Sequence, residues 1–389
     1  MTEATVTFIG GRIFDGTRLH EGHAALFRDG VFVGMEPSAQ GRPGTHIIDL
    51  DNDILTPGYV DLQVNGGGGV MLNDDPCSET LLRIVNAHRL LGTVAILPTL
   101  ITDRPEKTTA AIDAVRAAIR EGMQGVAGLH LEGPHLSVAR KGAHDPALIR
   151  PMTDADLQQL VDAKADIPIL KVTIAPENVT ADQVRQLTQA GILVSLGHSD
   201  ADFETCRDYA EAGATCVTHL FNAMSQLGNR EPGLVGAALA LGGLSAGLIA
   251  DGLHVHPETM RAAWSCKTGP GQIFLVSDAM AVAGTDDTEF RLDGRRIGRE
   301  RGRLTLEDGT LAGADLDLTE AVRVLVNKVG IDLADALCAA ISTPAKVVGL
   351  STGLIPGQTR LDDMIRIAAD LSGLHPLDAM AHSSQSVAS

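Results

Sequence analysis

Apolar runs and helix-like stretches alternate along most of this chain. Between residue 59 and about residue 344, short apolar runs typical of buried strands are followed by longer stretches with apolar residues at helical spacing. The predicted strands cover residues 59–64, 94–98, 126–131, 167–173, 192–196, 214–218, 245–250 and 272–276. The predicted helices cover residues 79–91, 105–121, 154–165, 181–189, 202–211 and 257–267. Eight strands with crossover helices predict an α/β fold, the (β/α)8 TIM barrel. An open, doubly wound sheet is the alternative.

The two ends of the chain have a different pattern. Residues 5–51 contain short strands separated by Gly-Gly and Asp-Gly turns, and residues 353–369 return to strand-like character. We expect these segments to pair in a small β-sandwich domain. The predicted parts are residues 1–54 (sandwich, N-terminal part), 55–350 (barrel domain with a β-hairpin insertion at 287–309), 351–375 (sandwich, C-terminal part) and 376–389 (flexible tail). The insertion is rich in arginine, and we expect a solvated, polar hairpin.

The composition narrows the classes of function. The formal net charge of −18 argues against binding of nucleic acid or of anionic membranes, so an anionic substrate would need a local basic pocket. The five cysteines are scattered without a Cys-x-x-Cys pair, as expected for reduced thiols in a cytoplasmic protein. Neither a signal peptide nor an apolar run of the ~20 residues that a membrane helix needs is visible.

Polar side chains with metal-binding chemistry stand at the ends of predicted strands. Glu132, His198 and His219 each end or follow an apolar strand, and the carboxyl ends of barrel strands meet at one face. Two imidazoles and one carboxylate with an open position are typical of a catalytic metal site. For each residue alone, an ion-paired glutamate or a satisfied core histidine is the alternative. Asp278 follows the last strand and is a candidate proton carrier facing the same centre.

Seven short segments match a known family, in the same order. They are 57–63 (PGYVDLQ), 131–135 (LEGPH), 141–144 (KGAH), 196–199 (LGHS), 218–224 (THLFNAM), 250–254 (ADGLH) and 276–279 (VSDA). On these segments, which span most of the chain, it resembles the N-acetylglucosamine-6-phosphate deacetylases of the amidohydrolase superfamily. The resemblance implies a barrel with a β-sandwich built from both termini.

The resemblance also implies a site and a reaction. Glu132, His198 and His219 would bind one divalent metal ion, expected to be zinc, with iron, cobalt or manganese as alternatives. Asp278 would act as general base and then as general acid. The substrate-binding residues that the resemblance implies are His144 (at the acetamide carbonyl), Asn222, Ala223 and Arg230 (near the phosphate) and His254. The reaction would be metal-dependent hydrolysis of N-acetyl-D-glucosamine 6-phosphate to D-glucosamine 6-phosphate and acetate, with a water activated by the metal as nucleophile.

In such enzymes the arginine reaches across from the neighbouring subunit, so the resemblance implies a homodimer in which Arg230 completes the partner's site. Its guanidinium offers a planar donor fork suited to phosphate. A surface ion pair with Glu231 is the alternative for Arg230. For His144, the alternative is a loop histidine without a catalytic role.

The chain departs from the wider superfamily on its first barrel strand. Many amidohydrolases carry His-x-His there and hold two metals, whereas this chain reads Gln63-Val64-Asn65. An amide oxygen is a poor substitute for an imidazole ligand, so one metal is the expected count. The C-terminal segment 356–362 follows the family's closing strand only in part, which leaves the last strand of the sandwich open.

Two other functions fit parts of the sequence. A dihydroorotase-like cyclic-amide hydrolase would bridge two metals with a carbamylated lysine on the fourth strand, where Lys171 lies. A binding scaffold that has lost its activity would lack a ligand or the base, and neither is missing here.

Overall fold

Eight parallel strands at the centre of the molecule close into a barrel. The computed structural model describes residues 5–37, 45–292 and 294–377. Adjacent strands follow the chain order, and the first and last meet through bonds from Asn65 N to Ala279 O (2.9 Å) and from Asp278 N to Gln63 O (3.1 Å). The strands are β8 (Tyr59–Val64), β11 (Thr93–Ile101), β12 (Leu129–Glu132), β13 (Leu170–Ile174), β14 (Leu193–Leu196), β15 (Cys216–Val217), β16 (Ser245–Leu248) and β17 (Ile273–Leu275). The predicted TIM barrel is confirmed, and the open sheet was the wrong alternative.

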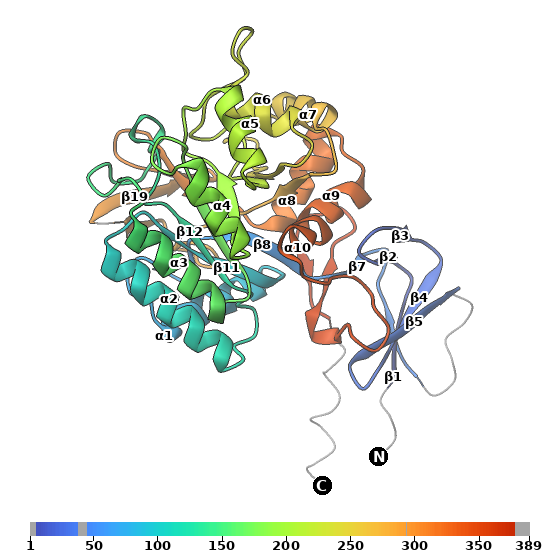
Figure 1. Cartoon of the computed structure of the whole chain (residues 1–389). Helices are drawn as coiled ribbons and strands as arrows, with labels where there is room; N and C mark the ends of the chain where they lie inside the picture. The colour runs from blue at the N-terminus through green and yellow to red at the C-terminus, as the bar shows by residue number, and fades with distance from the viewer. Residues whose placement is uncertain (1–4, 38–44, 293, 378–389) are drawn as a thin grey trace.

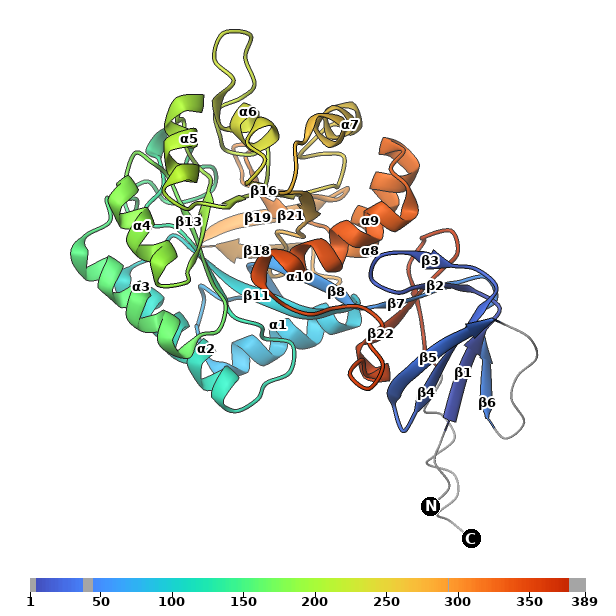
Figure 2. The same ribbon diagram turned by 45° about the vertical axis from the view of Figure 1, so that its right-hand side comes forward.

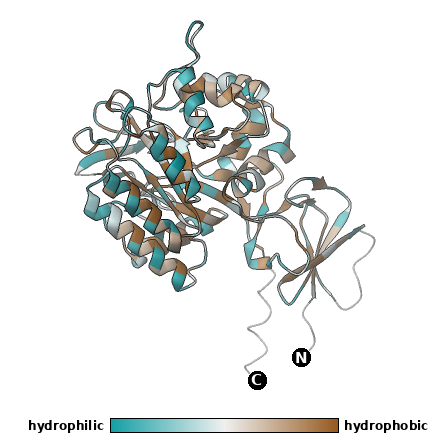
Figure 3. Cartoon of the chain, in the orientation of Figure 1, coloured by the Kyte–Doolittle hydropathy of each residue, from teal (hydrophilic) through white to brown (hydrophobic). Residues whose placement is uncertain are grey.

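Helices form the outer layer of the barrel (Figures 1 and 2). The helices are α1 (Ser78–Leu90), α2 (Pro105–Arg120), α3 (Asp154–Asp166), α4 (Ala181–Gln189), α5 (Phe203–Glu211), α6 (Gly233–Ala240), α7 (Pro257–Cys266), α8 (Leu318–Val324), α9 (Leu333–Ala340) and α10 (Ser342–Val348). The helix α2 shows the usual pattern, because it buries Ile112, Val115 and Ala118 on one face and has hydrophilic residues on the other (Figure 3). Short elements complete the barrel domain: β9 (Gly66–Gly67), β10 (Val70–Met71), η1 (Val138–Arg140) and the π-helical turn η2 (Leu325–Val329).

The sequence did not predict α6. Seven of its eight residues are buried, so it has no polar face and no helical alternation of polar and apolar residues. A helix that is apolar all round gives no periodic signal. Among the helices that the structure describes, none is long and apolar enough to cross a membrane.

A small β domain lies beside the barrel and joins the two ends of the chain (Figure 2). One sheet contains β1 (Thr5–Ile9), β4 (His23–Arg28), β5 (Val31–Pro37) and β6 (His46–Asp49). The other contains β2 (Arg12–Phe14), β3 (Leu19–His20), β7 (Ile54–Pro57), β22 (Met364–Ile367) and β23 (Leu374–His375), with η3 (Leu361–Asp363) before β22. Because β22 pairs with β7, the C-terminal segment does complete the N-terminal unit. The predicted tail 376–389 lies outside the described residues from 378 onward.

The insertion after β17 is larger than the predicted hairpin. It forms a four-stranded antiparallel sheet of β18 (Glu289–Leu292), β19 (Arg295–Glu300), β20 (Arg303–Thr305) and β21 (Leu311–Ala314). Leu292, Ile297 and Leu304 are fully buried and pack with Met71 and Met280 of the barrel. The expectation of a solvated hairpin therefore holds for only one face, because the other face packs on the mouth of the barrel.

Candidate active site

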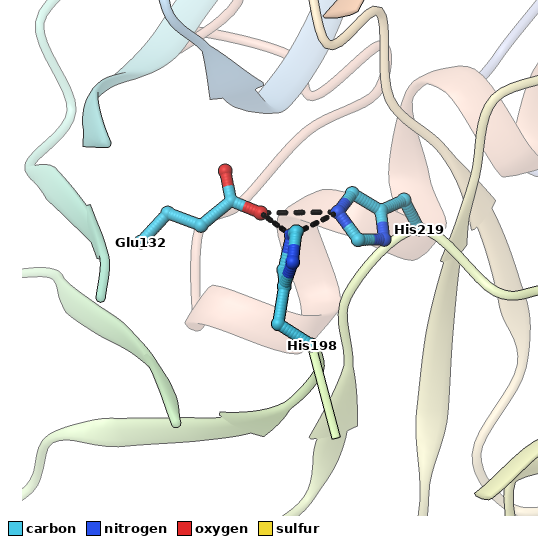
Figure 4. Close-up of side chains that lie close together, drawn as sticks. All are labelled: Glu132, His198 and His219. Atoms are coloured by element: carbon cyan, nitrogen blue, oxygen red, sulfur yellow. Dashed lines mark hydrogen bonds and ion pairs between the residues drawn. The ribbon is translucent and has the colours of Figure 1, made fainter. Parts of the chain in front are cut away.

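Three side chains converge at the carboxyl ends of three barrel strands, two of which are adjacent. Glu132 is the last residue of β12, and His198 and His219 follow β14 and β15. Oε1 of Glu132 lies 3.2 Å from Nε2 of His198 and 3.0 Å from Nε2 of His219, and the two Nε2 atoms are 3.0 Å apart (Figure 4). All three side chains are buried, and together they form a group whose ligand atoms lie within 4.8 Å of one another.

The backbone turns sharply where the strands end. His198, His219, Ala223 and Asp278 all have positive φ angles, of 47°, 29°, 50° and 51°. Non-glycine residues seldom adopt this conformation, and it costs of order 1–3 kcal/mol at each position. The turns aim these residues at a common centre instead of continuing each strand.

The donor set fits a divalent metal ion. The Nδ1 atom of His198 lies 2.8 Å from the carbonyl oxygen of Arg140 and must donate to it, which leaves the lone pair of Nε2 facing Glu132. Burial raises the pKa of Glu132, but its close contacts with the His198 and His219 rings outweigh burial and hold that pKa well below its usual value. A carboxylate and two imidazoles are ligands that zinc and similar ions accept.

A cavity of about 420 Å³ opens above these three residues. Eight of the nine predicted site residues line it: Glu132, His144, His198, His219, Asn222, Ala223, His254 and Asp278. A second hollow, of about 490 Å³, lies between α7, α9, α10 and the turn at Gly16 and Thr17, and no predicted site residue lines it. The predicted chemistry is therefore gathered in the cavity at the carboxyl ends of the strands.

The carboxylate of Asp278 is held by two amides. Nε2 of Gln63 lies 3.0 Å from Oδ1 of Asp278, and Nδ2 of Asn65 lies 2.7 Å from the same oxygen. Burial, followed by the negative charge of Glu132, raises the pKa of Asp278 above its usual value. A carboxyl group with a raised pKa, close to a metal-binding triad, is suited to accept and return a proton.

His144 presents a defined tautomer to the cavity. The backbone N–H of Thr102 donates to Nδ1 of His144 at 3.3 Å, and the Thr102 hydroxyl lies 2.8 Å from the same nitrogen. Because a backbone N–H can only donate, Nδ1 is the acceptor and the ring proton is on Nε2. Burial, followed by repulsion from His198, lowers the pKa of His144 to about 3, so the ring is a neutral donor at neutral pH.

His254 is fixed from behind by Asp251. Nδ1 of His254 lies 2.6 Å from Oδ2 of Asp251, so Nε2 is left for the cavity that the ring lines. His256, two residues on, instead caps α7 by accepting the N–H of Glu258 at 3.2 Å, as its position before Pro257 suggests.

Arg230 is not among the residues that line this cavity. It lies in an exposed loop, residues 226–231, that leads into α6 and projects from the barrel (Figures 1 and 2). Glu231 accepts the backbone N–H groups of Phe203 and Gly233, at 2.8 Å and 2.9 Å, and makes no ion pair with Arg230. The suggested surface pair is therefore wrong, and Arg230 lies in an exposed loop outside the cavity of its own chain.

Lys171 lies deeper in the barrel than the ligand triad. Thr173, not Lys171, is paired with Glu132, and Nζ of Lys171 lies 3.4 Å from the carbonyl oxygen of Leu62. Its side chain is fully buried and does not line the cavity. This position does not suit a lysine that bridges two metals at the barrel mouth.

The sequence did not predict several residues that lie around the cavity. Thr102 and Asp251 act through His144 and His254, whereas Leu292 and Thr310 of the β18–β21 insertion line the cavity itself. The Nη2 atom of Arg295 also donates to the carbonyl oxygen of Ala143 at 2.8 Å, which joins the insertion to the loop that carries His144. Alternating apolar residues in the insertion were its one signal of a buried face.

Comparison with known proteins finds a matching family and similar proteins. The profile of the amidohydrolase family matches residues 54–357. An N-acetylgalactosamine-6-phosphate deacetylase of Shewanella sp. (strain ANA-3) is 42% identical over 341 residues, which cover 87% of this chain and 86% of that protein.

Solved structures resemble the whole fold. N-acetylglucosamine-6-phosphate deacetylase from Pasteurella multocida has a TM-score of 0.88 at 33% identity, over 95% of this chain and 97% of that one. A mutant of N-acetyl-D-glucosamine-6-phosphate deacetylase from Mycobacterium smegmatis, in complex with N-acetyl-D-glucosamine-6-phosphate, has a TM-score of 0.86 at 29% identity, over 96% and 97% of the two chains.

Proposed function

The chain belongs to the amidohydrolase family, and from this premise we propose that it hydrolyses the acetamide of N-acetyl-D-glucosamine 6-phosphate to D-glucosamine 6-phosphate and acetate. The observation that carries the proposal is the convergence of Glu132, His198 and His219 with Asp278 and His144 around one cavity. Hydrolysis of an amide needs a nucleophile, a group that stabilises the oxyanion and a proton donor for the leaving nitrogen. The cavity contains a candidate for each role.

Each residue has one task in the proposed reaction. A divalent metal at the triad would polarise the scissile carbonyl and lower the pKa of a water molecule. Asp278 takes a proton from the attacking water as the new carbon–oxygen bond forms. It then returns the proton to the nitrogen as the carbon–nitrogen bond breaks. His144 donates from Nε2 to the carbonyl oxygen while negative charge develops there.

The proposed metal content is one ion per chain. Gln63 and Asn65 turn their NH₂ groups toward the carboxylate of Asp278, and donors of this kind do not bind a cation. Zinc is the proposed ion because two imidazoles and one carboxylate suit it, with iron, cobalt or manganese as alternatives.

The phosphate requires donors that one chain does not fully supply. Asn222 and Ala223 line the cavity and offer neutral donors, whereas Arg230 is exposed and does not line it. We therefore propose a homodimer in which Arg230 of each chain completes the phosphate site of its partner. This arrangement would let a protein with a net charge of −18 hold an anionic substrate through one local guanidinium. The five free cysteines fit the reducing cytoplasm, which is the proposed location.

Hydrolysis of N-acetyl-D-galactosamine 6-phosphate is the second candidate. The relative that is 42% identical is named an N-acetylgalactosamine-6-phosphate deacetylase, so sequence similarity does not show which of the two epimers this chain prefers. The epimers differ at one hydroxyl group, and a buried donor or acceptor that pairs with one hydroxyl can discriminate strongly against its absence.

Acetate release tests the proposal directly. The substrates are N-acetylglucosamine 6-phosphate, its galacto epimer and unphosphorylated N-acetylglucosamine, each with and without chelator. We expect hydrolysis of a phosphorylated substrate only, loss of activity with chelator, and recovery on addition of one equivalent of a divalent ion. Asp278→Asn is expected to lower kcat by roughly 10²–10⁴-fold. No acetate from either phosphosugar in the presence of metal would contradict the proposal, and two ions per chain would favour a cyclic-amide hydrolase.

A further inference from the structure

Gln63 lies between the two carboxylates of the site. Its Nε2 atom is 3.1 Å from Oε2 of Glu132 and 3.0 Å from Oδ1 of Asp278, so both N–H groups of one amide are used. Asn65 adds a third donor, with Nδ2 at 2.7 Å from Oδ1 of Asp278. All four side chains are buried, with exposed fractions between 0% and 8%.

The barrel closure fixes the positions of these residues. The backbone N–H of Asp278 donates to the carbonyl oxygen of Gln63 at 3.1 Å, and that of Asn65 donates to Ala279 at 2.9 Å. Gln63 lies near the end of β8 and Asn65 follows its last residue, two positions further on, so their side chains point to the same side. That side is the barrel interior, where Asp278 stands at the end of the neighbouring strand.

The orientation of both amides follows from what they face. The opposite orientation would place an amide oxygen 2.7 Å from a carboxylate oxygen, and two acceptors cannot form a hydrogen bond. As a consequence, Oε1 of Gln63 and Oδ1 of Asn65 are buried without a hydrogen-bond partner among the described residues. An unpaired buried acceptor is unfavourable, so this arrangement stabilises the two carboxylates while leaving the two amide oxygens without hydrogen bonds.

The two oxygens of each carboxylate are thereby given different surroundings. Oδ1 of Asp278 receives two donors, and no described residue donates to Oδ2, although the side chain lines the cavity. In Glu132, Oε2 receives the amide of Gln63, and Oε1 faces the two imidazoles.

We propose that Gln63 and Asn65 are positioning residues that anchor Asp278 by Oδ1 and reserve Oδ2 for proton transfer, while Gln63 also turns Oε1 of Glu132 toward the histidines. The proposal rests on the proposed deacetylase function and deepens it. The neutral amide of Gln63 donates to both buried carboxylates and so offsets part of the cost of burying two negative charges close together. Without it, a second cation would be needed for this. Neither Gln63 nor Asn65 contacts the reacting atoms in this scheme.

Asn65→Ala is the main test, because Asn65 contacts Asp278 and not Glu132. We expect kcat for the preferred phosphosugar to fall by roughly 10- to 100-fold, the usual effect of losing a supporting hydrogen bond at a metal site. KM is expected to stay within about a factor of two, because the proposal has Asn65 act through Asp278 and not on the substrate. One metal per chain by mass spectrometry, and unchanged affinity for the amino-sugar product by calorimetry, are the expected readouts that do not depend on turnover.

Gln63→Ala is the second variant, and it has a different expected signature. It is expected to lower kcat and also to weaken metal affinity by roughly 10- to 100-fold, because Glu132 loses its anchor. Asn178→Ala is the matched control, since its amide donates to the carbonyl oxygen of Leu136 at 2.5 Å and does not line the cavity. We expect this control to keep wild-type kcat.

The outcomes separate this inference from the proposed function. A wild-type protein that hydrolyses neither epimer would overturn both. An active wild type whose two variants keep kcat within about twofold would overturn only the positioning roles, as would an equal loss of kcat in Asn178→Ala. A metal ion found between Gln63, Asn65 and Asp278 would also overturn them, because the amides would then have to present their oxygens.

Discussion

Nδ1 of His254 lies 2.6 Å from Oδ2 of Asp251, and the two side chains are only 7% and 5% exposed. The other carboxylate oxygen of Asp251 accepts the backbone N–H groups of Leu253 and His254, both at 2.8 Å. Burial raises the pKa of Asp251, but the hydrogen bond with His254 outweighs it, and the net shift is downward. One carboxylate thus organises the loop after β16 and decides which nitrogen of His254 faces the cavity.

Asp251→Ala is expected to lower kcat/KM for the phosphosugar by roughly 100-fold, because a misplacement of about 1 Å in a positioning group can have that effect. The loss should fall mainly on KM, since His254 is a proposed substrate contact. Steady-state kinetics measure both constants. Asp182→Ala, at a carboxylate that is 84% exposed on α4, is the control. An unchanged KM in Asp251→Ala would show that the contact between Asp251 and His254 does not contribute to substrate binding.

Thr102→Val is expected to lower kcat by roughly tenfold, which is less than the 10²–10³-fold effect of removing an oxyanion donor outright. The hydroxyl contact with Nδ1 of His144 is lost, whereas the backbone N–H that also favours the Nε2–H tautomer remains. Thr102→Ser keeps the hydroxyl and should restore kcat. Nitrogen NMR of the His144 ring would report the tautomer independently, and an Nδ1–H form in the wild type would refute the assignment.

Mixed dimers test whether Arg230 acts on the neighbouring site. Arg230→Ala and Asp278→Asn chains should each be nearly inactive alone. In a mixed dimer, one site combines an intact Asp278 with Arg230 of the other chain, so refolded 1:1 mixtures should regain about a quarter of wild-type activity, because half of the dimers are mixed and each has one complete site. Activity that does not rise on mixing would place Arg230 in its own site or outside the mechanism.

The small β domain should lose stability at low pH through Asp53. Its carboxylate lies 2.6 Å from Nε of Arg366 and 2.7 Å from Nδ1 of His375, which joins β7 to the C-terminal strands. Burial raises the pKa of Asp53, but the bonds with His375 and Arg366 outweigh it and lower the pKa below the ordinary 3.8. The stabilisation is therefore present above pH 3.8 and is lost as the pH falls through the folded-state pKa.

Asp53→Asn is accordingly expected to cost about 2 kcal/mol at pH 7 and much less near the folded-state pKa of Asp53. Urea unfolding at several pH values, with hydrogen exchange of the β7 and β22 amides, measures this difference. A penalty that is the same at every pH would mean that the charge of Asp53 does not matter.

The sequence was sufficient to predict the barrel and the convergence of Glu132, His198 and His219. Eight apolar runs follow one another, most of them separated by helical stretches, and the carboxyl ends of parallel strands must meet at one face. Glu132, His198 and His219 could therefore be expected to converge from their places in the chain alone. The same reasoning placed Asp278 opposite them.

Other features depended on contacts between distant residues. The bond between Gln63 and Asp278 joins positions 215 residues apart, and the one between Thr102 and His144 joins positions 42 apart. Neither contact leaves a local pattern, and α6 lacks one because it is buried on all sides. The arginines of residues 287–309 predict a solvated hairpin. The packing of the β18–β21 sheet on the barrel involves distant residues, so the local sequence does not predict it.

The sequence by itself determined which elements form and which functional groups reach the strand ends, because hydrophobic periodicity and chain order are local properties. Only the tertiary structure decided which nitrogen of each histidine faces the cavity, which oxygen of each carboxylate is free, and that Arg230 does not line the cavity of its own chain. Those choices depend on hydrogen-bond partners that only the closed barrel brings within reach.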